Sequence, residues 1–184
     1  SIIDPATTFV DSDVEVGRDT ILYPMTYLES GTVIGENCEI GPSVRIQNTK
    51  IGNDVTGQFL YAHDAVVDDH VKLGQFVHLR PGTHICEGVT IDNFIEVKNS
   101  TIGKGSKLPH LSYIGDCDMG ENVNMGCGTI TVNYDGKKKF RTKIGNNAFV
   151  GCNSNLVAPV TVEDGAYIAA GSTITQTVPK DTLA

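Results

Sequence analysis

Tryptophan is absent from this sequence, and aromatic residues make up only 7% of its 184 positions. No apolar run reaches the roughly 18 residues that a membrane span requires, and no charged-then-apolar signal segment opens the chain, so we expect no membrane partner. Basic residues are also few, with 14 Lys and Arg against 22 Asp and Glu. The resulting net charge of −8 argues against a nucleic-acid-binding protein, which needs a basic face.

Paired cysteines are missing as well. Cys38, Cys86, Cys117, Cys127 and Cys152 form no C-x-x-C motif, and their number is odd. A zinc site or a disulfide framework has closer, paired spacing. We therefore expect free thiols, no metal site and a reducing, cytoplasmic location.

What the sequence does contain is a six-residue repeat of large aliphatic residues, often followed by one of its 20 glycines. The three longest trains are Val10, Val16, Leu22, Leu28, Ile34, Ile40 and Ile46; Val67, Leu73, Leu79, Ile85, Ile91 and Val97; and Ile144, Val150, Leu156, Val162, Ile168 and Ile174. A period of six does not match the 3.6 residues of an α-helical turn, but it fits a short strand followed by a tight turn. The pattern predicts an all-β chain, a parallel β-helix of hexapeptide repeats. Three hexapeptides close one triangular coil, so about ten coils form one domain over residues 1–184.

Two segments interrupt the repeat. Residues 52–66 hold no clean train, which predicts one irregular coil. Between Met125 and Ile144 the chain has seven residues more than two repeats need, which predicts an inserted loop over about 131–143. This loop carries five of the 14 cations of the chain. It is either a solvated loop or, as positive charge on an acidic background suggests, a binding site for an anionic ligand.

The repeat also converts sequence distance into spatial distance, because residues 18 apart lie on adjacent coils. Arg80 and Lys98 are 18 apart at the same outward position, so we expect two stacked cations. Either they are a screened surface pair, or an anion such as phosphate lies between them. Glu96 and Tyr113 occupy one outward position on successive coils, at the corner leading to these cations.

Histidine spacing can be compared with the same coil length. The five histidines, at positions 63, 70, 78, 84 and 110, are separated by 7, 8, 6 and 26 residues, and none of these matches a multiple of 18. A histidine metal site on stacked coils is therefore not expected.

Several motifs are far more specific than the repeat. They are Leu79-Arg-Pro-Gly82, Asn93-Phe-Ile-Glu-Val-Lys98, the segment from Gly103 to Asp116 with its Pro-His-Leu-Ser-Tyr core, the segment from Asn122 to Gly136, and Leu156-Val-Ala-Pro-Val-Thr-Val162. Together they resemble the C-terminal acetyltransferase half of the bifunctional bacterial N-acetylglucosamine-1-phosphate uridyltransferase/glucosamine-1-phosphate N-acetyltransferases. The resemblance is nearly continuous over residues 73–184 and consists mainly of the hexapeptide rhythm over 1–72.

The resemblance implies a left-handed β-helix that assembles as a homotrimer. It implies transfer of the acetyl group of acetyl-CoA to the amine of glucosamine 1-phosphate without a metal, with His110 as general base and a backbone N–H near Cys127 stabilising the oxyanion. The residues matching the family's acceptor site are Arg80, Lys98, Tyr113, Asn124 and Lys139. Those matching its acetyl-CoA contacts are Cys127, Asn133, Tyr134, Cys152 and Ala170. Asn124 lies on a different corner from Arg80 and Lys98, which favours sites shared between neighbouring prisms.

The sequence departs from the family in three places. Cys127 and Cys152 stand where Ala and Ser are familiar, which preserves a backbone contact but weakens a hydroxyl contact at position 152. The family's basic C-terminal tail is missing, so coenzyme A affinity is expected to fall. The uridyltransferase half is missing too, so uridyl transfer is not expected. Two other hypotheses remain: a hexapeptide acetyltransferase with a different acceptor, and a non-catalytic trimerising scaffold.

Overall fold

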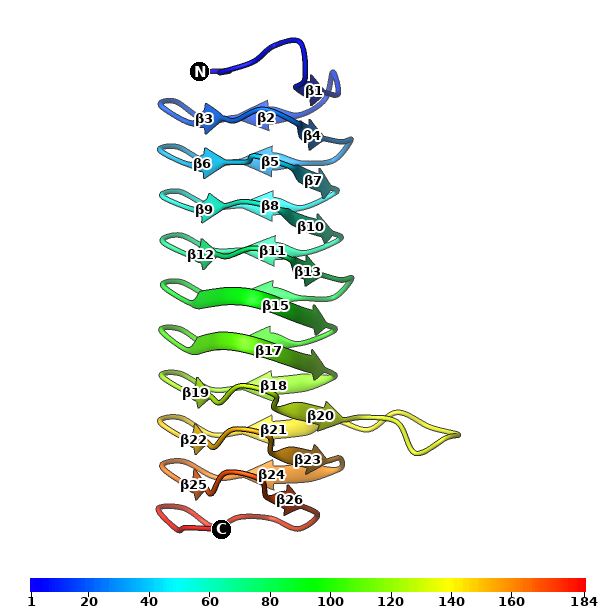
Figure 1. Ribbon diagram of the computed structural model, residues 1–184, viewed down its shortest axis with the longest axis vertical. Coiled ribbons are helices and arrows are strands. Elements are labelled where there is room, and N and C mark those ends of the chain that lie inside the picture. The colour runs from blue at the N-terminus through cyan, green and yellow to red at the C-terminus, as the bar shows by residue number, and fades with distance from the viewer.

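The computed structural model describes residues 1–184, which form a straight solenoid of parallel β-strands (Figure 1). The chain has no helix and winds through about nine turns, close to the ten predicted. The predicted all-β architecture of hexapeptide coils is confirmed, and it fits a left-handed β-helix. Nowhere does the structure contain a helix long and apolar enough to cross a membrane.

Three faces form the prism. The first face contains β3 (Ile21–Leu22), β6 (Glu39–Ile40), β9 (Thr56–Gly57), β12 (Lys72–Leu73), β19 (Asn124–Met125), β22 (Phe149–Val150) and β25 (Tyr167–Ile168). The second contains β1 (Phe9–Val10), β4 (Thr26–Leu28), β7 (Val44–Gln47), β10 (Leu60–His63), β13 (Val77–Leu79), β20 (Ile130–Val132), β23 (Asn155–Val157) and β26 (Thr173–Ile174). The long strands β15 (Thr90–Lys98) and β17 (Lys107–Gly115) run across both faces.

The third face is a separate nine-stranded sheet. Its strands are β2 (Glu15–Val16), β5 (Val33–Ile34), β8 (Lys50–Ile51), β11 (Val66–Val67), β14 (His84–Ile85), β16 (Thr101–Ile102), β18 (Cys117–Met119), β21 (Thr142–Ile144) and β24 (Val160–Val162). All three faces are parallel, because the chain meets each face once per coil and always in the same direction (Figure 1).

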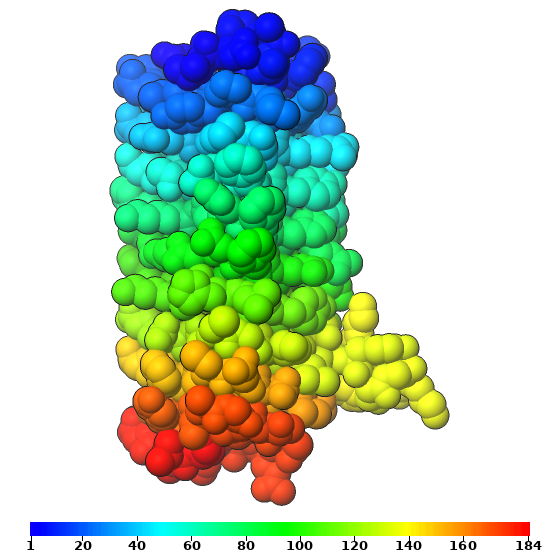
Figure 2. Space-filling view, in the orientation of Figure 1, coloured from blue at the N-terminus to red at the C-terminus, as the bar shows by residue number.

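The aliphatic trains form the core, as predicted. Leu28, Ile46 and Ile91 are at most 1% exposed, and 39 buried apolar residues make one continuous cluster. Val10 and Val16 are the exceptions, at 41% and 39% exposed, because no complete coil covers the N-terminal end of the column (Figure 2). Strand alternation explains the pattern, since every second side chain points inward.

The expectation of an irregular coil over residues 52–66 is confirmed, because Tyr61 pairs with Arg45 and Val66 pairs with Lys50, which makes this coil two residues shorter than the regular 18. The stretch still forms β9, β10 and the beginning of β11, which pair in parallel with their neighbours. Gly57 occupies the inward position that Ile40 holds one coil earlier. The side chain of Leu60 fills the space beside it, because a Cβ atom on Gly57 would lie only 2.7 Å from Leu60 Cδ2. The interruption of the repeat thus reflects a shortened coil with glycine in the aliphatic position.

The inserted loop lies where it was predicted but is shorter. Residues 133–141 separate β20 from β21, and both strands extend into the predicted range of 131–143. The loop projects from the side of the prism (Figures 1 and 2). Its two arms are joined by a bridge between Tyr134 and Lys139, and the amide of Phe140 donates to the carbonyl of Asn133 at 2.8 Å.

Two edges bound the second face. We call the edge shared with the first face the phenylalanine edge, because it carries Phe59, Phe76, Phe94 and Leu111. We call the edge shared with the third face the lysine edge. It carries Arg80, Lys98, Asn99, Asp116 and the beginning of the loop.

Candidate functional site

The predicted stack of cations lies on the lysine edge. Leu79 pairs with Val97, so the residues that follow them, Arg80 and Lys98, are neighbours on adjacent coils. Each cation also has an acidic partner. Arg80 Nη1 lies 2.8 Å from Glu96 Oε1, and Lys98 Nζ lies 3.6 Å from Asp116 Oδ1. The repulsion expected between stacked cations is therefore offset by one acid on the second face, Glu96, and one on the lysine edge, Asp116.

Asp116 is the centre of a polar cluster on this edge. Its side chain is only 6% exposed. Asn99 Nδ2 donates to one carboxylate oxygen at 2.7 Å, and Asn133 Nδ2 donates to the other at 2.7 Å. Burial alone would raise the pKa of Asp116, but these two hydrogen bonds and the charges of Lys98 and Lys139 outweigh it and hold that pKa below its ordinary value.

The inserted loop returns one of its lysines to the cluster. The side chain of Lys139 lies beside Lys98, and close contact between the two amino groups, together with the charge of Lys98, lowers the pKa of Lys139. Arg141 forms an ion pair with Asp118, at 2.6 Å between Nη2 and Oδ1. The loop thus divides its charge: Lys139 adds a second ammonium to the lysine edge, whereas Arg141 attaches the end of the loop to the third face.

Tyr113 links the cluster to the centre of the second face. Glu96 and Tyr113 pair across adjacent strands, as the spacing predicted. The Tyr113 hydroxyl accepts a hydrogen bond from Asn133 Nδ2 at 3.3 Å. Asn133, which the resemblance places among the acetyl-CoA contacts, therefore lies with the acceptor-site residues Lys98 and Tyr113 in this single chain.

Along the phenylalanine edge, four predicted site residues form a vertical column. Asn93 pairs with His110, and the registers of the next strands place Cys127, Cys152 and Ala170 below it on successive coils. The side chains of His110, Cys152 and Ala170 are exposed, and Cys127 is half-buried. The amides of Cys127, Cys152 and Ala170 donate no hydrogen bond within the chain, so they are available to a ligand.

The same edge carries an unusual row of apolar residues. Phe76, Phe94 and Leu111 are 56%, 58% and 59% exposed. All three have left-handed backbone conformations, with φ of 58°, 61° and 38°. Bulky side chains rarely adopt this conformation, which costs roughly 1–2 kcal/mol per residue. Exposure of three adjacent large apolar side chains to water is unfavourable, and such a row is typical of a surface that another molecule covers.

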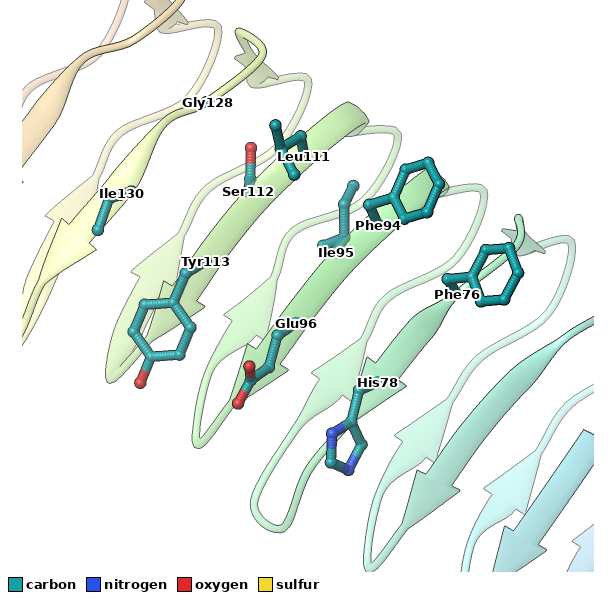
Figure 3. A pocket seen from close by; sticks show the side chains of 10 residues that line it. All are labelled: Phe76, His78, Phe94, Ile95, Glu96, Leu111, Ser112, Tyr113, Gly128 and Ile130. Atoms are coloured by element: carbon teal, nitrogen blue, oxygen red, sulfur yellow. The ribbon is translucent and has the colours of Figure 1, made fainter.

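A shallow groove of about 480 Å³ joins the two edges across the second face (Figure 3). Phe76, Phe94 and Leu111 line one side of it, and the outward row His78, Glu96 and Tyr113 forms its floor. The groove therefore runs from the column that contains His110 toward the cationic cluster.

Two predicted site residues lie elsewhere. Asn124 is in β19 on the first face, with its side chain directed outward, since its neighbour Met125 is buried in the core. Tyr134 is exposed in the loop, where its hydroxyl donates to the carbonyl of Gly136 at 2.7 Å. The expectation that Asn124 and the two stacked cations lie on different sides of the prism is confirmed.

One group of side chains of the metal-binding type is present, on the third face. Ligand atoms of Asp68, His84 and Cys86 all lie within 4.8 Å of one another, and Asp68 Oδ2 is 2.9 Å from His84 Nε2. Sequence reasoning missed this group because it compared histidines only with histidines. Asp68 and Cys86 are 18 residues apart, which is one coil.

Sequence reasoning also gave no role to Asp116. The signal was present: Asn99, Asp116 and Asn133 are separated by 17 residues each, the length of a coil with one five-residue step. That spacing places an amide above and an amide below the carboxylate on one edge of the prism.

Comparison with known proteins agrees with this geometry. Residues 13–48 and 141–176 match the family model described as bacterial transferase hexapeptide (six repeats). The whole chain aligns at 57% identity with the bifunctional protein GlmU of Geobacillus sp. (strain WCH70), and at 54% with that of Caldanaerobacter subterraneus subsp. tengcongensis. This chain is related to the C-terminal part of GlmU. It spans 40% of the length of these GlmU relatives.

Solved structures support the fold. The UDP-N-acetylglucosamine acyltransferase of Arabidopsis superposes with a TM-score of 0.76 at 14% identity, covering 96% of this chain and 68% of that one. The acetyltransferase domain of PglB from Neisseria gonorrhoeae, solved in complex with acetyl coenzyme A, gives 0.51 at 17% identity, covering 66% of this chain and 55% of that one. At these identities the likeness establishes the β-helix and nothing further.

Proposed function

We propose that this chain transfers the acetyl group of acetyl-CoA to the amine of glucosamine 1-phosphate. One observation carries the proposal: three cations that the resemblance places in the acceptor site, Arg80, Lys98 and Lys139, meet on the lysine edge of a chain with a net charge of −8. The identity of 57% to a GlmU, over the whole chain, supports the same reaction.

The phosphate of the acceptor binds at the lysine edge. Arg80 offers a guanidinium that can hold two phosphate oxygens, and Lys98 and Lys139 add two ammonium groups. Tyr113 lies between this cluster and the groove, where it meets the sugar. A phosphorylated amino sugar then lies over the second face with its amine directed toward the phenylalanine edge.

Acetyl-CoA binds along the phenylalanine edge. The free amides of Cys127, Cys152 and Ala170 form a ladder of donors running along the prism, which fits an elongated ligand with carbonyl groups. Because these contacts come from the backbone, cysteine at positions 127 and 152 is compatible with them. Acetyl-CoA supplies the activated acetyl group as a thioester.

His110 lies at the head of this column and acts as general base. It takes a proton from the attacking amine as the new N–C bond forms at the thioester carbonyl. The amide of Cys127, one coil away, donates to the oxyanion that develops. The C–S bond then breaks, and the proton passes to the departing thiolate, so the products are N-acetylglucosamine 1-phosphate and free coenzyme A.

We further propose that the working unit is a homotrimer with sites between protomers. The exposed row of Phe76, Phe94 and Leu111 supports burial of this edge against a second copy. Asn124 faces outward from the first face, so it reaches an acceptor held by Arg80 and Lys98 only from a neighbouring prism. The five cysteines are all free, which supports the reducing, cytoplasmic location expected from the sequence.

Release of free thiol from acetyl-CoA, measured with a panel of acceptors, tests the proposal. Release with glucosamine 1-phosphate, and weaker release with glucosamine or glucosamine 6-phosphate, is expected. Release only with another amino sugar or a hydroxyl acceptor contradicts the proposed substrate. No release from a stable trimer contradicts the proposed activity and favours a scaffold.

A further inference from the structure

The lysine edge contains the same polar turn twice. Asn48 Nδ2 donates to Asp64 Oδ1 at 2.7 Å, and three coils later Asn99 Nδ2 donates to Asp116 Oδ1 at 2.7 Å. Both aspartates have a left-handed backbone with φ of 51°. A short polar side chain suits this conformation because it can hydrogen-bond locally. The Asn–Asp pair is therefore a structural device of the edge.

Asp116 has contacts that Asp64 lacks. The side chain of Asp64 is 48% exposed, whereas that of Asp116 is 6% exposed. The second oxygen of Asp116 accepts from Asn133 Nδ2, and Lys98 Nζ lies 3.6 Å from the first. The second oxygen of Asp64 lies 3.3 Å from His63 Nδ1, but Asp64 has neither a second amide nor a lysine partner, so those contacts of Asp116 need a separate explanation.

Two neighbouring lysines explain the additional contacts of Asp116. Lys98 and Lys139 lie side by side, and Lys98 is the main cause of the lowered pKa of Lys139. Two ammonium groups this close repel each other, and Lys98, only 18% exposed, has little solvent to screen it. The negative charge of Asp116 attracts both. A buried carboxylate is costly unless it is paired, so the carboxylate and the two ammonium groups stabilise each other.

We propose that Asp116 is a positioning residue that holds Lys98, and through it Lys139, in place for the phosphate of the acceptor. This inference rests on the proposed function. Asp116 does not itself meet the phosphate, because like charges repel and its two oxygens are already bound by Asn99 and Asn133. It orients the cations, leaving Lys98 and Lys139 with an excess of positive charge.

A double-mutant cycle on the full chain tests this role. We expect D116N to raise the KM for glucosamine 1-phosphate about tenfold, because the buried ion-pair partner of Lys98 is lost. The KM for acetyl-CoA and the thermal unfolding midpoint of the trimer are read in parallel. In a K98M background the same substitution is expected to change the acceptor KM by less than about twofold, because its effect is transmitted through Lys98.

D64N is the matched control, since it removes the same turn carboxylate where no lysine is present. We expect it to leave both KM values unchanged. D116E keeps the charge but moves it by one methylene, so we expect a KM for the acceptor between those of the wild type and D116N. If D116N does not fold, the KM of D116E is used as the test.

Three results overturn the inference: an unchanged acceptor KM in D116N or D116E, equal effects of D116N with and without Lys98, or equal effects of D64N and D116N. Absence of wild-type activity with glucosamine 1-phosphate contradicts the proposed function instead, so the two failures are distinguishable.

Discussion

The two edges of the second face share one backbone geometry but have opposite surfaces. On the lysine edge, left-handed positions are held by Asn99 and Asp116, with φ of 44° and 51°. On the phenylalanine edge, the corresponding positions are held by Phe76 and Phe94, with φ of 58° and 61°. Asparagine and aspartate stabilise the turn with their own side chains, but phenylalanine does not. The repeat therefore fixes the backbone turn, whereas the residue at the turn determines whether the edge is polar or apolar.

A polar residue at the turn gives an edge whose buried acid is satisfied within the chain. Asp116 is buried among two amides and a lysine, and Arg80 is paired with Glu96. An apolar residue at the turn gives an edge that exposes large side chains and is complete only when something covers it. The proposed reaction uses both: one edge binds the phosphate, and the other binds the coenzyme and a neighbouring chain.

The largest expected effect tests whether chemistry belongs to the phenylalanine edge. His110→Ala should lower kcat by about 10²–10⁴, because the general base is removed from the attacking amine. H70A is the control, since His70 is another exposed histidine and lies outside both edges. Steady-state thiol release measures both variants. Full activity in H110A contradicts the assignment of the base.

The next effect tests whether the phenylalanine edge is covered in solution. Phe94→Asp places a charge in the middle of the apolar row, and we expect the trimer to dissociate or weaken, with loss of activity in proportion. V66D is the control, because Val66 is also exposed, at 39%, but lies on the third face. Sedimentation velocity gives the assembly state. A trimer that survives in F94D as well as in V66D contradicts the interface.

The smallest effect concerns stability at the lysine edge. The folded-state pKa of Asp116 lies below its ordinary value, so its ionised form stabilises the folded chain above that value, and this contribution is lost as pH falls through the folded pKa. At pH 7 we expect D116N to lower the free energy of unfolding by about 1–3 kcal/mol. The difference should shrink steadily in acid, as measured by denaturant unfolding. A difference that grows in acid contradicts the proposed charge pairing.

Much of the fold and part of the lysine edge can be predicted from the sequence. A period of six defines the coils, and the 18-residue spacing of Arg80 and Lys98 is enough to place them together. The resemblance to the acetyltransferase half of the bifunctional enzymes is confirmed by the comparisons. What spacing does not reveal is a side chain that compensates for a missing one, as Leu60 does beside Gly57, or the path of an inserted loop that returns Lys139 to Lys98.

The apolar residues at the turns could not be identified from the sequence. Phe76 and Phe94 fall at a turn position where glycine or asparagine is expected, and nothing in the period of the repeat distinguishes them. Their meaning depends on exposure and φ together, which only the structure provides. Asp116 could have been found, because its 17-residue spacing from Asn99 and from Asn133 follows from coil length alone.

We propose that the lysine edge of one protomer and the first face of another together form each acceptor site. Co-expression of K98M with N124A tests it most directly, after each variant alone has been found impaired. When each site takes Lys98 from one chain and Asn124 from its neighbour, one of the three sites in every mixed trimer contains both native residues. The purified mixed trimers should then regain about a third of wild-type thiol release. Activity no higher than the mean of the two single variants would contradict the account and place each complete site within one chain.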